Sequence, residues 1–332
     1  MKTHSRKTSK KHFSGSKHKL LIWIIVLLIA GATGYMYLNK NTSPSHADAD
    51  LNLYVSTLGN DSNPGTIKRP LRSIHQALAL KGELSASALA INIVGPSYLV
   101  DKKDYVAAGY QIPNRITEGS VSMGPLQSAA TVISGRQTTI YAESPVENIS
   151  FFVGNTGTLK IGGLRFTVGL VAQASGRDAS IQIAANDFSL AWAPDHADAD
   201  LDLSCSSSSY CRATKNTFTI FNGPFGDMLV NALNLNSYGS ASIDADWNTF
   251  KYPATEDWPD ELNPPGPGGY QIRGIVSWGS SPSRILGNTF VSDKFNGKTG
   301  FLGYVGISYS PSAVVGKNSF TKFSGIPLDK RN

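Results

Sequence analysis

The chain has 332 residues, of which 41% are hydrophobic and only 16% are charged, and it contains 32 Gly, 17 Pro and 2 Cys. Charged residues fall well below the ~25% of an average soluble domain, which argues against a helix-rich enzyme with a salt-bridged surface. Two cysteines exclude a disulfide-built miniprotein and a multi-cysteine zinc protein, and the length fits either two average domains or one long β architecture.

The net charge of +6 comes from the N-terminal tail. Eight of the 30 basic residues lie in the first forty positions, which contain no acid, so 22 basic and 24 acidic residues remain from residue 41 onward, a net charge of −2. A nucleic-acid-binding protein needs a basic face that neutralises phosphates. We therefore expect no nucleic-acid partner.

Residues 1–19 form the basic tail, and residues 20–38 form an apolar run without a charge. Such a run is about as long as a helix that crosses ~30 Å of hydrocarbon. Positive residues before it predict a cytoplasmic N-terminus, an anchor in the lipid bilayer and an exported remainder. The alternative is a cleaved signal peptide, because Ala30-Gly31-Ala32 fits a small-x-small cleavage site. Both interpretations place residues 41–332 outside the cytoplasm, either membrane-bound or secreted.

Export would place Cys205 and Cys211 in an oxidising compartment, and the five residues between them are mostly serine. A disulfide is therefore expected rather than a metal site. Closing so short a loop stabilises the fold by about 2 kcal/mol in the chain-entropy picture, so the bridge would act as a local clip.

The exported part begins with a polar stalk over residues 39–50. A strand-like alternation over residues 53–57 follows, then the turn formers of residues 59–66, and then a helical pattern after Pro70 in which Leu71, Ile74 and Leu78 share one face. This order, over residues 51–82, resembles the N-terminal cap of right-handed parallel β-helix proteins of the pectate-lyase-like superfamily. The resemblance implies a solenoid that begins with a short capping helix.

An Asn-x-Phe triplet recurs along the chain with Phe-to-Phe spacings of 30, 32, 40 and 30, and it starts at Asn186, Asn216, Asn248, Asn288 and Asn318. A period of this length is typical of a solenoid. In coils stacked at ~4.8 Å, each position recurs directly above its equivalent. We expect the asparagine to adopt the left-handed conformation at a bend and to hydrogen-bond along the stack, and the phenylalanine to line the core.

These features predict an all-β fold. Residues 51–332 are expected to form a right-handed parallel β-helix solenoid, preceded by an N-terminal transmembrane helix and a short capping helix. The alternative is a pair of β-sandwiches, which requires antiparallel hairpins, and the chain has few of the tight Asn-Gly or Asp-Gly links that make them.

The β-helix resemblance implies a groove that holds a long glycan. Members of the superfamily that cleave uronates need a basic residue to take a proton and a cation or Arg to stabilise the carboxylate. The candidate catalytic residues are Asp244 and Asp246, which alternate outward on one predicted strand, together with Lys251 and Arg273. The alternative is two solvated acids and a surface ion pair.

An acidic segment offers a second candidate site. Residues 196–203 (HADADLDL) repeat residues 46–53 (HADADLNL) almost letter for letter. Asp198, Asp200 and Asp202 alternate, so a strand would present three carboxylates on one edge, and such hard oxygen ligands suit Ca²⁺. No glycine turn or bidentate Glu completes an EF-hand loop, so a solvated acidic loop is the alternative.

The longest spacing in the repeat, between Phe250 and Phe290, contains a segment rich in Pro and Gly that must loop out of its coil. Its aromatic residues would offer flat faces to sugar rings, and the candidates are Tyr252, Trp258, Tyr270 and Trp278. The alternative is that Tyr270 and Trp278 pack against the coil and hold the loop down.

The expected function is that of a membrane-anchored, extracytoplasmic β-helix protein that binds a polysaccharide or cell-envelope glycan without cleaving it. The Asn-Thr-Asp, Asp-Asp and Gly-His-Gly motifs expected of β-helix polygalacturonases do not occur, which argues against that hydrolase branch. A polysaccharide lyase or uronate epimerase is the alternative. It would require the four candidate catalytic residues to converge in one groove.

Overall fold

A computed structural model describes residues 50–104, 112–126, 137–143, 148–189, 200–220, 229–252, 271–292, 304–321 and 326–330. Residues 43–332 form one compact unit. The predicted basic tail, the apolar run 20–38 and all but the last residue of the predicted stalk lie outside the described residues. Within the described ranges, none of the helices has the length and hydrophobicity required to cross a membrane.

The described strands form three sheets. Sheet 1 contains, in spatial order, β1 (Leu51–Val55), β2 (Ala88–Ile93), β5 (Ser120–Pro125), β8 (Thr158–Gly162), β11 (Ser180–Ala184), β14 (Tyr210–Thr214), β17 (Ser242–Asp246), β20 (Ser283–Leu286) and β23 (Val314–Gly316). Sheet 2 contains β3 (Ser97–Leu99), β6 (Thr138–Tyr141), β9 (Leu164–Phe166), β12 (Asp187–Phe188), β15 (Thr217–Thr219), β18 (Thr249–Tyr252), β21 (Thr289–Ser292) and β24 (Ser319–Thr321). Sheet 3 contains β4 (Asn114–Ile116), β7 (Asn148–Gly154), β10 (Gly169–Ser175), β13 (Leu201–Ser206), β16 (Leu229–Ser237), β19 (Gln271–Gly279), β22 (Tyr304–Tyr309) and β25 (Ile326–Lys330).

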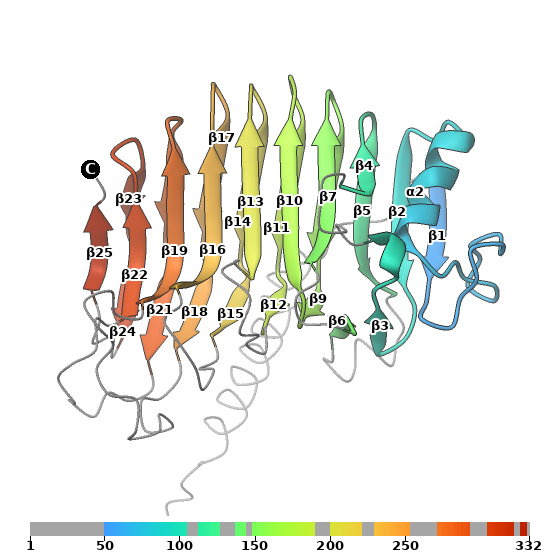
Figure 1. The fold of residues 1–332 in the computed structure, drawn as a ribbon, viewed down its shortest axis with the longest axis horizontal. Helices are drawn as coiled ribbons and strands as arrows, with labels where there is room; N and C mark the ends of the chain where they lie inside the picture. Colours follow the sequence, from blue (N-terminus) through green and yellow to red (C-terminus); the bar gives the residue numbers. More distant parts are fainter. Residues whose placement is uncertain are drawn as a thin grey trace, which may run out of the picture. The chain divides into compact units, whose positions relative to one another are not determined.

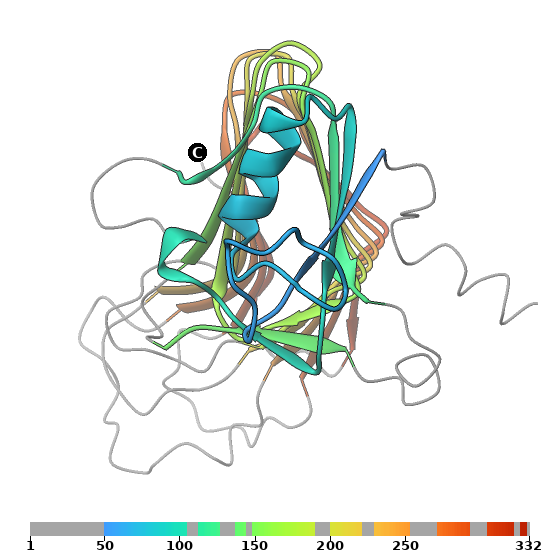
Figure 2. The same ribbon diagram turned by 90° about the vertical axis from the view of Figure 1, so that its right-hand side faces the viewer.

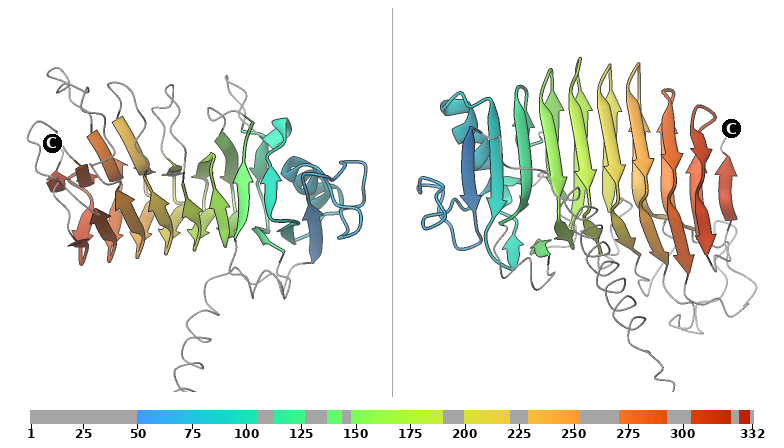
Figure 3. Two further views of the ribbon diagram at one scale, coloured as in Figure 1. Left: turned by 90° about the horizontal axis from the view of Figure 1, so that it is seen from below. Right: turned by 180° about the vertical axis from the view of Figure 1, so that it is seen from behind.

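The chain visits sheets 1, 2 and 3 in turn and then begins the next coil, so strands that are neighbours in a sheet are three strands apart along most of the chain. Each pairing between these strands is parallel, as in β14–β17, β15–β18 and β13–β16. Figures 1 and 3 show the strands side by side along the stack. The predicted parallel solenoid is confirmed, and the β-sandwich alternative is wrong because its antiparallel hairpins do not occur between the described strands.

A column of phenylalanines fills the interior behind sheet 2. The rings of neighbouring coils stack with centroids 4.8–5.1 Å apart, and the column contains Phe166, Phe188, Phe218, Phe250, Phe290 and Phe320. This distance equals the spacing of parallel strands, so identical residues at one coil position come into contact automatically. Five of these rings are fully buried, which confirms the predicted role of the triplet's phenylalanine.

A ladder of asparagines marks the corner between sheets 1 and 2. The backbone N–H and the side-chain amide of Asn216 both donate to Oδ1 of Asn248, at 3.0 Å each, and Asn248 donates to Asn288 in the same way. The predicted hydrogen bonding along the stack is therefore confirmed. The predicted backbone conformation is wrong, because the left-handed residue is the one before each asparagine, for example Lys215 with φ 56° and Trp247 with φ 58°.

The N-terminal end of the stack is covered by α2 (Ile74–Glu83), which Figure 2 shows lying across the first coil. Ser73 caps this helix by accepting a hydrogen bond from the Gln76 N–H, as N-cap serines do. The helix buries Ile74, Ala77 and Leu78 against the coil, so apolar surface that would otherwise face water at the end of the solenoid is covered. The 3₁₀ turn η1 (Lys102–Asp104) completes the cap through Asp104, whose carboxylate accepts from the first helical N–H groups.

The three corners of the coil differ in length. From β8 onward, corner 1–2 holds one or two residues and corner 3–1 holds three or four, as in residues 247–248 and 238–241. Corner 2–3 holds residues 189–200, 220–228, 253–270 and 293–303 in four successive coils, with two residues (167–168) in the coil before them and four (322–325) in the last. All of the long connections in this part of the chain therefore begin or end at the edge that sheet 2 shares with sheet 3.

Candidate functional site

The outward face of sheet 3 carries a continuous row of side chains, one from each of six neighbouring strands. Alternation along each strand turns one set of residues inward, such as Leu203 and Leu235, and leaves the next set outward. The register aligns six of the outward residues, which we call the outer row: Arg115, Phe152, Gln173, Ser204, Asn236 and Trp278. At the spacing of parallel strands, the row is about 24 Å long.

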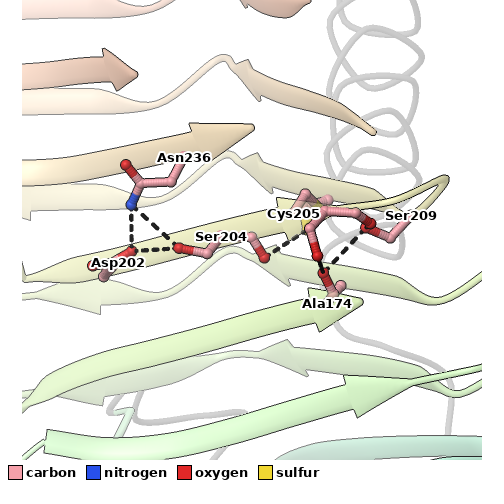
Figure 4. Close-up of a disulfide and its surroundings, with 8 residues drawn as sticks. Ala174, Asp202, Ser204, Cys205, Ser209 and Asn236 are labelled. Atoms are coloured by element: carbon pink, nitrogen blue, oxygen red, sulfur yellow. Dashed lines mark hydrogen bonds between the residues drawn. A yellow bond between two sulfur atoms is a disulfide. The ribbon is translucent and has the colours of Figure 1, made fainter. Parts of the chain in front are cut away.

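The middle of the outer row is polar. Figure 4 shows Asn236 above Asp202 and Ser204: its side-chain amide donates to Oδ1 of Asp202 at 2.9 Å and to Oγ of Ser204 at 3.2 Å. The Ser204 hydroxyl also donates to Oδ1 of Asp202, at 3.1 Å. These bonds hold the three side chains in one arrangement on the sheet. Polar groups that are already ordered bind a ligand with a smaller loss of conformational entropy.

Aromatic side chains stand near both ends of the outer row. Trp278 is 45% exposed at one end. At the other end the guanidinium of Arg115 lies 4.7 Å from the centroid of the Phe152 ring, a cation–π contact that orients both groups. The row therefore has a flat apolar surface and a cation at one end, hydroxyl and amide groups in the middle, and an exposed indole at the other end.

A disulfide lies at the edge of this face. Cys205 on β13 and Cys211 on β14 form the bond across corner 3–1, and both residues are fully buried. The neighbouring Ser209 hydroxyl donates to the carbonyls of Ala174 and Ser206 (Figure 4). The bond and these hydrogen bonds hold together the end of β13 that carries Ser204.

The acids Asp244 and Asp246 lie on β17 in sheet 1, and both are paired with arginines from neighbouring coils. Arg212 donates to Oδ2 of Asp246 through Nε and Nη2, at 3.2 and 3.0 Å, and Arg284 lies 3.6 Å from Asp244. The Tyr210 hydroxyl donates to Asp244, and burial together with the Asp244 charge raises the pKa of Tyr210 to about 12. Burial is the main cause that raises the pKa of Asp246, and the neighbouring Asp244 charge raises it further.

The four candidate catalytic residues lie on three different sheets. Asp244 and Asp246 belong to sheet 1, Lys251 is on β18 in sheet 2, and Arg273 is on β19 in sheet 3. Acid–base catalysis needs its groups within reach of one substrate atom. The structure brings the two acids together but does not bring Lys251 or Arg273 to them.

Of the three predicted calcium ligands, Asp198 lies outside the described residues, and the other two differ in environment. Asp202 faces outward in the polar part of the sheet 3 face, whereas Asp200 is only 8% exposed. Burial raises the pKa of Asp200 well above its ordinary value, and its carboxyl has no hydrogen bond or charge partner among the described side chains. In the described ranges no three His, Cys, Asp or Glu side chains gather as metal ligands.

Two of the predicted sugar-stacking residues are described, and they differ in exposure. Tyr252 is 3% exposed and its hydroxyl donates to the Val305 carbonyl inside the coil, so its ring belongs to the core and cannot stack on a sugar. That expectation is wrong because Tyr252 shares the inward parity of Phe250 on β18. Trp258 and Tyr270 lie outside the described residues. Trp278 is exposed on the outer row.

Sequence reasoning missed the rest of the outer row. Ser204 and Asn236 are separated by 32 residues, the same interval that separates Phe218 from Phe250. That shared interval was the available signal, since residues one period apart must lie side by side in a solenoid. Comparison of the chain with protein-family models, with curated proteins and with solved structures finds no match.

Proposed function

We propose that the exported part of the chain is a glycan-binding module that holds an extended polysaccharide along the outer row of sheet 3 and does not cleave it. In this proposal the module is a right-handed β-helix of the pectate-lyase-like kind, fixed to the cell membrane by residues 20–38. The observation that carries the proposal is the outer row itself: a fixed line of hydroxyl and amide groups with an exposed indole at one end.

The chemistry of the row suits a neutral or weakly charged sugar chain. Sugar rings present hydroxyl groups at their edges and apolar C–H groups on their faces. Asn236 and Ser204 offer donors and acceptors for the hydroxyls, and Trp278 offers a flat surface for a ring face. The length of about 24 Å suits several consecutive sugars of an extended chain.

The position of the long connections supports the same face. Loops on a rigid scaffold carry most binding function, and from β8 onward the long connections meet one edge of sheet 3. The dispersal of Asp244, Lys251 and Arg273 over three sheets supports binding rather than catalysis, because these candidate residues do not share one face of the coil.

The proposal is tested by measuring affinity of the full-length protein for a panel of polysaccharides by isothermal titration calorimetry. We expect the Trp278→Ala and Asn236→Ala variants each to bind the best glycan about tenfold more weakly, a loss of ~1.4 kcal/mol. Tyr238→Ala is the matched control, since Tyr238 is similarly exposed (51%) but lies in corner 3–1 beyond the row.

Two results would contradict this function. Unchanged affinity in both outer-row variants would remove sheet 3 as the binding face. Ultraviolet absorbance from unsaturated products during incubation with acidic polysaccharides would establish a lyase, and loss of that signal in Arg273→Ala would place the chemistry on β19.

A further inference from the structure

Each coil passes from sheet 1 to sheet 2 at a corner that does not border sheet 3. From β11 onward, one residue in each coil takes the left-handed conformation there, directly before a ladder asparagine. In all but the last coil, the backbone N–H of each of these residues donates to the carbonyl of the residue just before its equivalent in the next coil, as Lys215 does to Asp246 and Trp247 to Leu286. We call them the corner row: Ala185, Lys215, Trp247, Gly287 and Lys317.

Trp247 is an unusual residue for this position. Its φ is 58°, and a bulky side chain with a positive φ is strained where Gly or Asn would not be. Its indole is nevertheless 61% exposed. One part of the ring lies over Gly287, where an added Cβ would sit 2.8–3.0 Å from three adjacent ring atoms. The ring therefore rests with its face on the glycine backbone, and its other side is open to solvent.

Two lysines flank this indole along the corner row. Lys215 lies one coil before Trp247 and Lys317 two coils after it, so the three positions span about 14 Å at the spacing of parallel strands. Both lysines are exposed, and neither forms an ion pair with another described residue. The nearby acids of β17 are each paired with an arginine, Asp246 with Arg212 and Asp244 with Arg284, so they do not cancel the lysine charges.

We propose that Trp247, Lys215 and Lys317 form a second binding site, which takes a sugar chain carrying anionic groups. A sugar ring would stack on the open side of the indole, and the lysines would bind carboxylate or phosphate groups of neighbouring sugars. This inference rests on the proposed function and names a ligand class and a surface for it. The corner imposes the left-handed backbone in successive coils, and the site explains why a tryptophan occupies this position, because an exposed flat side chain is needed there.

The test compares three probes in titrations of the full-length protein. Polygalacturonate carries both rings and carboxylates, its fully methyl-esterified form carries the rings alone, and poly(glycerol phosphate) carries the charges alone. We expect Trp247→Asn to weaken the binding of polygalacturonate about tenfold and to leave the affinity for poly(glycerol phosphate) unchanged. The double variant Lys215→Gln, Lys317→Gln should bind both charged probes about fivefold more weakly and should bind the methyl ester with unchanged affinity.

Two controls separate this site from general effects. Lys68→Gln removes the same charge from an exposed position in the N-terminal cap, and it should leave all three affinities unchanged. Asn tolerates the left-handed conformation, so Trp247→Asn should keep or raise the thermal unfolding midpoint. A lower midpoint with unchanged affinity would show that Trp247 only covers Gly287, and the proposal would then fail.

The outcomes also distinguish the two faces. Loss of binding in Trp278→Ala but not in Trp247→Asn would overturn the corner site and keep the sheet 3 face. The reverse pattern would support the corner site, and unchanged affinity in Asn236→Ala as well would remove the sheet 3 face. Binding of poly(glycerol phosphate) alone would mark a simple ionic surface, and no binding of any polysaccharide would overturn both proposals.

Discussion

Two aspartates in a duplicated octapeptide show how strongly the fold controls a side chain's chemistry. Asp50 and Asp200 each precede a strand that begins with Leu, β1 and β13. Asp50 accepts hydrogen bonds from the side chain and backbone of Ser87, and the side-chain bond lowers its pKa. Asp200 is buried without a partner in the described part of the chain, and desolvation raises its pKa well above the ordinary value. The same residues therefore begin a strand in both places. The pKa of the aspartate shifts in opposite directions, however, because the two strands belong to different sheets.

Replacing Asp200 by Asn should stabilise the protein at neutral and alkaline pH. A carboxyl whose pKa is raised in the folded state binds more protons there than in the unfolded chain, so wild-type stability falls as the pH rises from about 4 through the folded pKa. The amide has no charge to desolvate. Thermal unfolding of Asp200→Asn and wild type should therefore differ most at pH 8 and converge near pH 4.

Asp50→Asn is the control with the opposite sign. The lowered pKa of Asp50 contributes stability above the unfolded pKa of about 3.9, and this contribution disappears as the pH falls through the folded pKa. The variant should thus be slightly less stable than wild type at pH 7. If Asp200→Asn also lowers the unfolding temperature at pH 8, burial does not dominate the ionisation of Asp200.

At the scale of elements, the asparagine ladder and the phenylalanine column hold the coils in register. Each ladder asparagine satisfies buried polar groups in two neighbouring coils. The Asn248 carbonyl oxygen accepts from the backbone and side chain of Asn216, and its amide donates to the Ala213 carbonyl and to Asn288. Removal of one member leaves donors and acceptors unpaired on both sides.

Asn248→Ala should destabilise the protein by about 3 kcal/mol or more, because each buried group left without a partner costs ~1–3 kcal/mol. Chemical denaturation with a fluorescence readout measures this loss. Asn318→Ala is the matched control at the last ladder position, where the asparagine is only part-buried and water can replace its bonds. Equal losses at the two positions would contradict a cooperative buried ladder.

The sequence repeat predicted these elements well but could not predict the site. Asn and Phe recur at fixed intervals, and stacking makes identical residues touch, so periodicity alone predicts the ladder and the column. The left-handed residue was misplaced by one position because Ala185, Lys215 and Trp247 share no side-chain feature that marks the bend. The outer row was missed because its residues differ from coil to coil, so the repeat interval was its single sequence signal, and the register of sheet 3 shows which residues align.

The dispersal of the candidate catalytic residues has a similar cause. Asp246, Lys251 and Arg273 are close in sequence, but each corner of the coil rotates the chain to a new face. Nearness along the chain is therefore a poor guide to nearness in space within one coil. Residues about one period apart on neighbouring coils, such as Arg284 and Asp244 in direct register or Arg212 and Asp246 diagonally, are the ones that meet.

At the scale of the whole molecule, the N-terminal apolar run and the disulfide make linked predictions about location. Disulfides persist in oxidising compartments and are rare in the cytosol. Cys205 and Cys211 are fully buried in their bonded form, so their oxidation state records the compartment in which the protein folded. The sequence predicts that residues 20–38 carry the chain there.

Introducing Leu27→Arg and Ile29→Arg together should stop export, because each arginine costs ~2.5–3.5 kcal/mol near the centre of a membrane-spanning helix. Full-length wild type should sediment with membranes, resist carbonate extraction and show no alkylation of its cysteines after denaturation without reductant. The double variant should remain in the soluble fraction with Cys205 and Cys211 both alkylated, as read by mass spectrometry. Recovery of wild type from the soluble cytosolic fraction with both thiols alkylated would contradict export, whereas an oxidised protein that lacks residues 1–32 would identify the segment as a cleaved signal peptide.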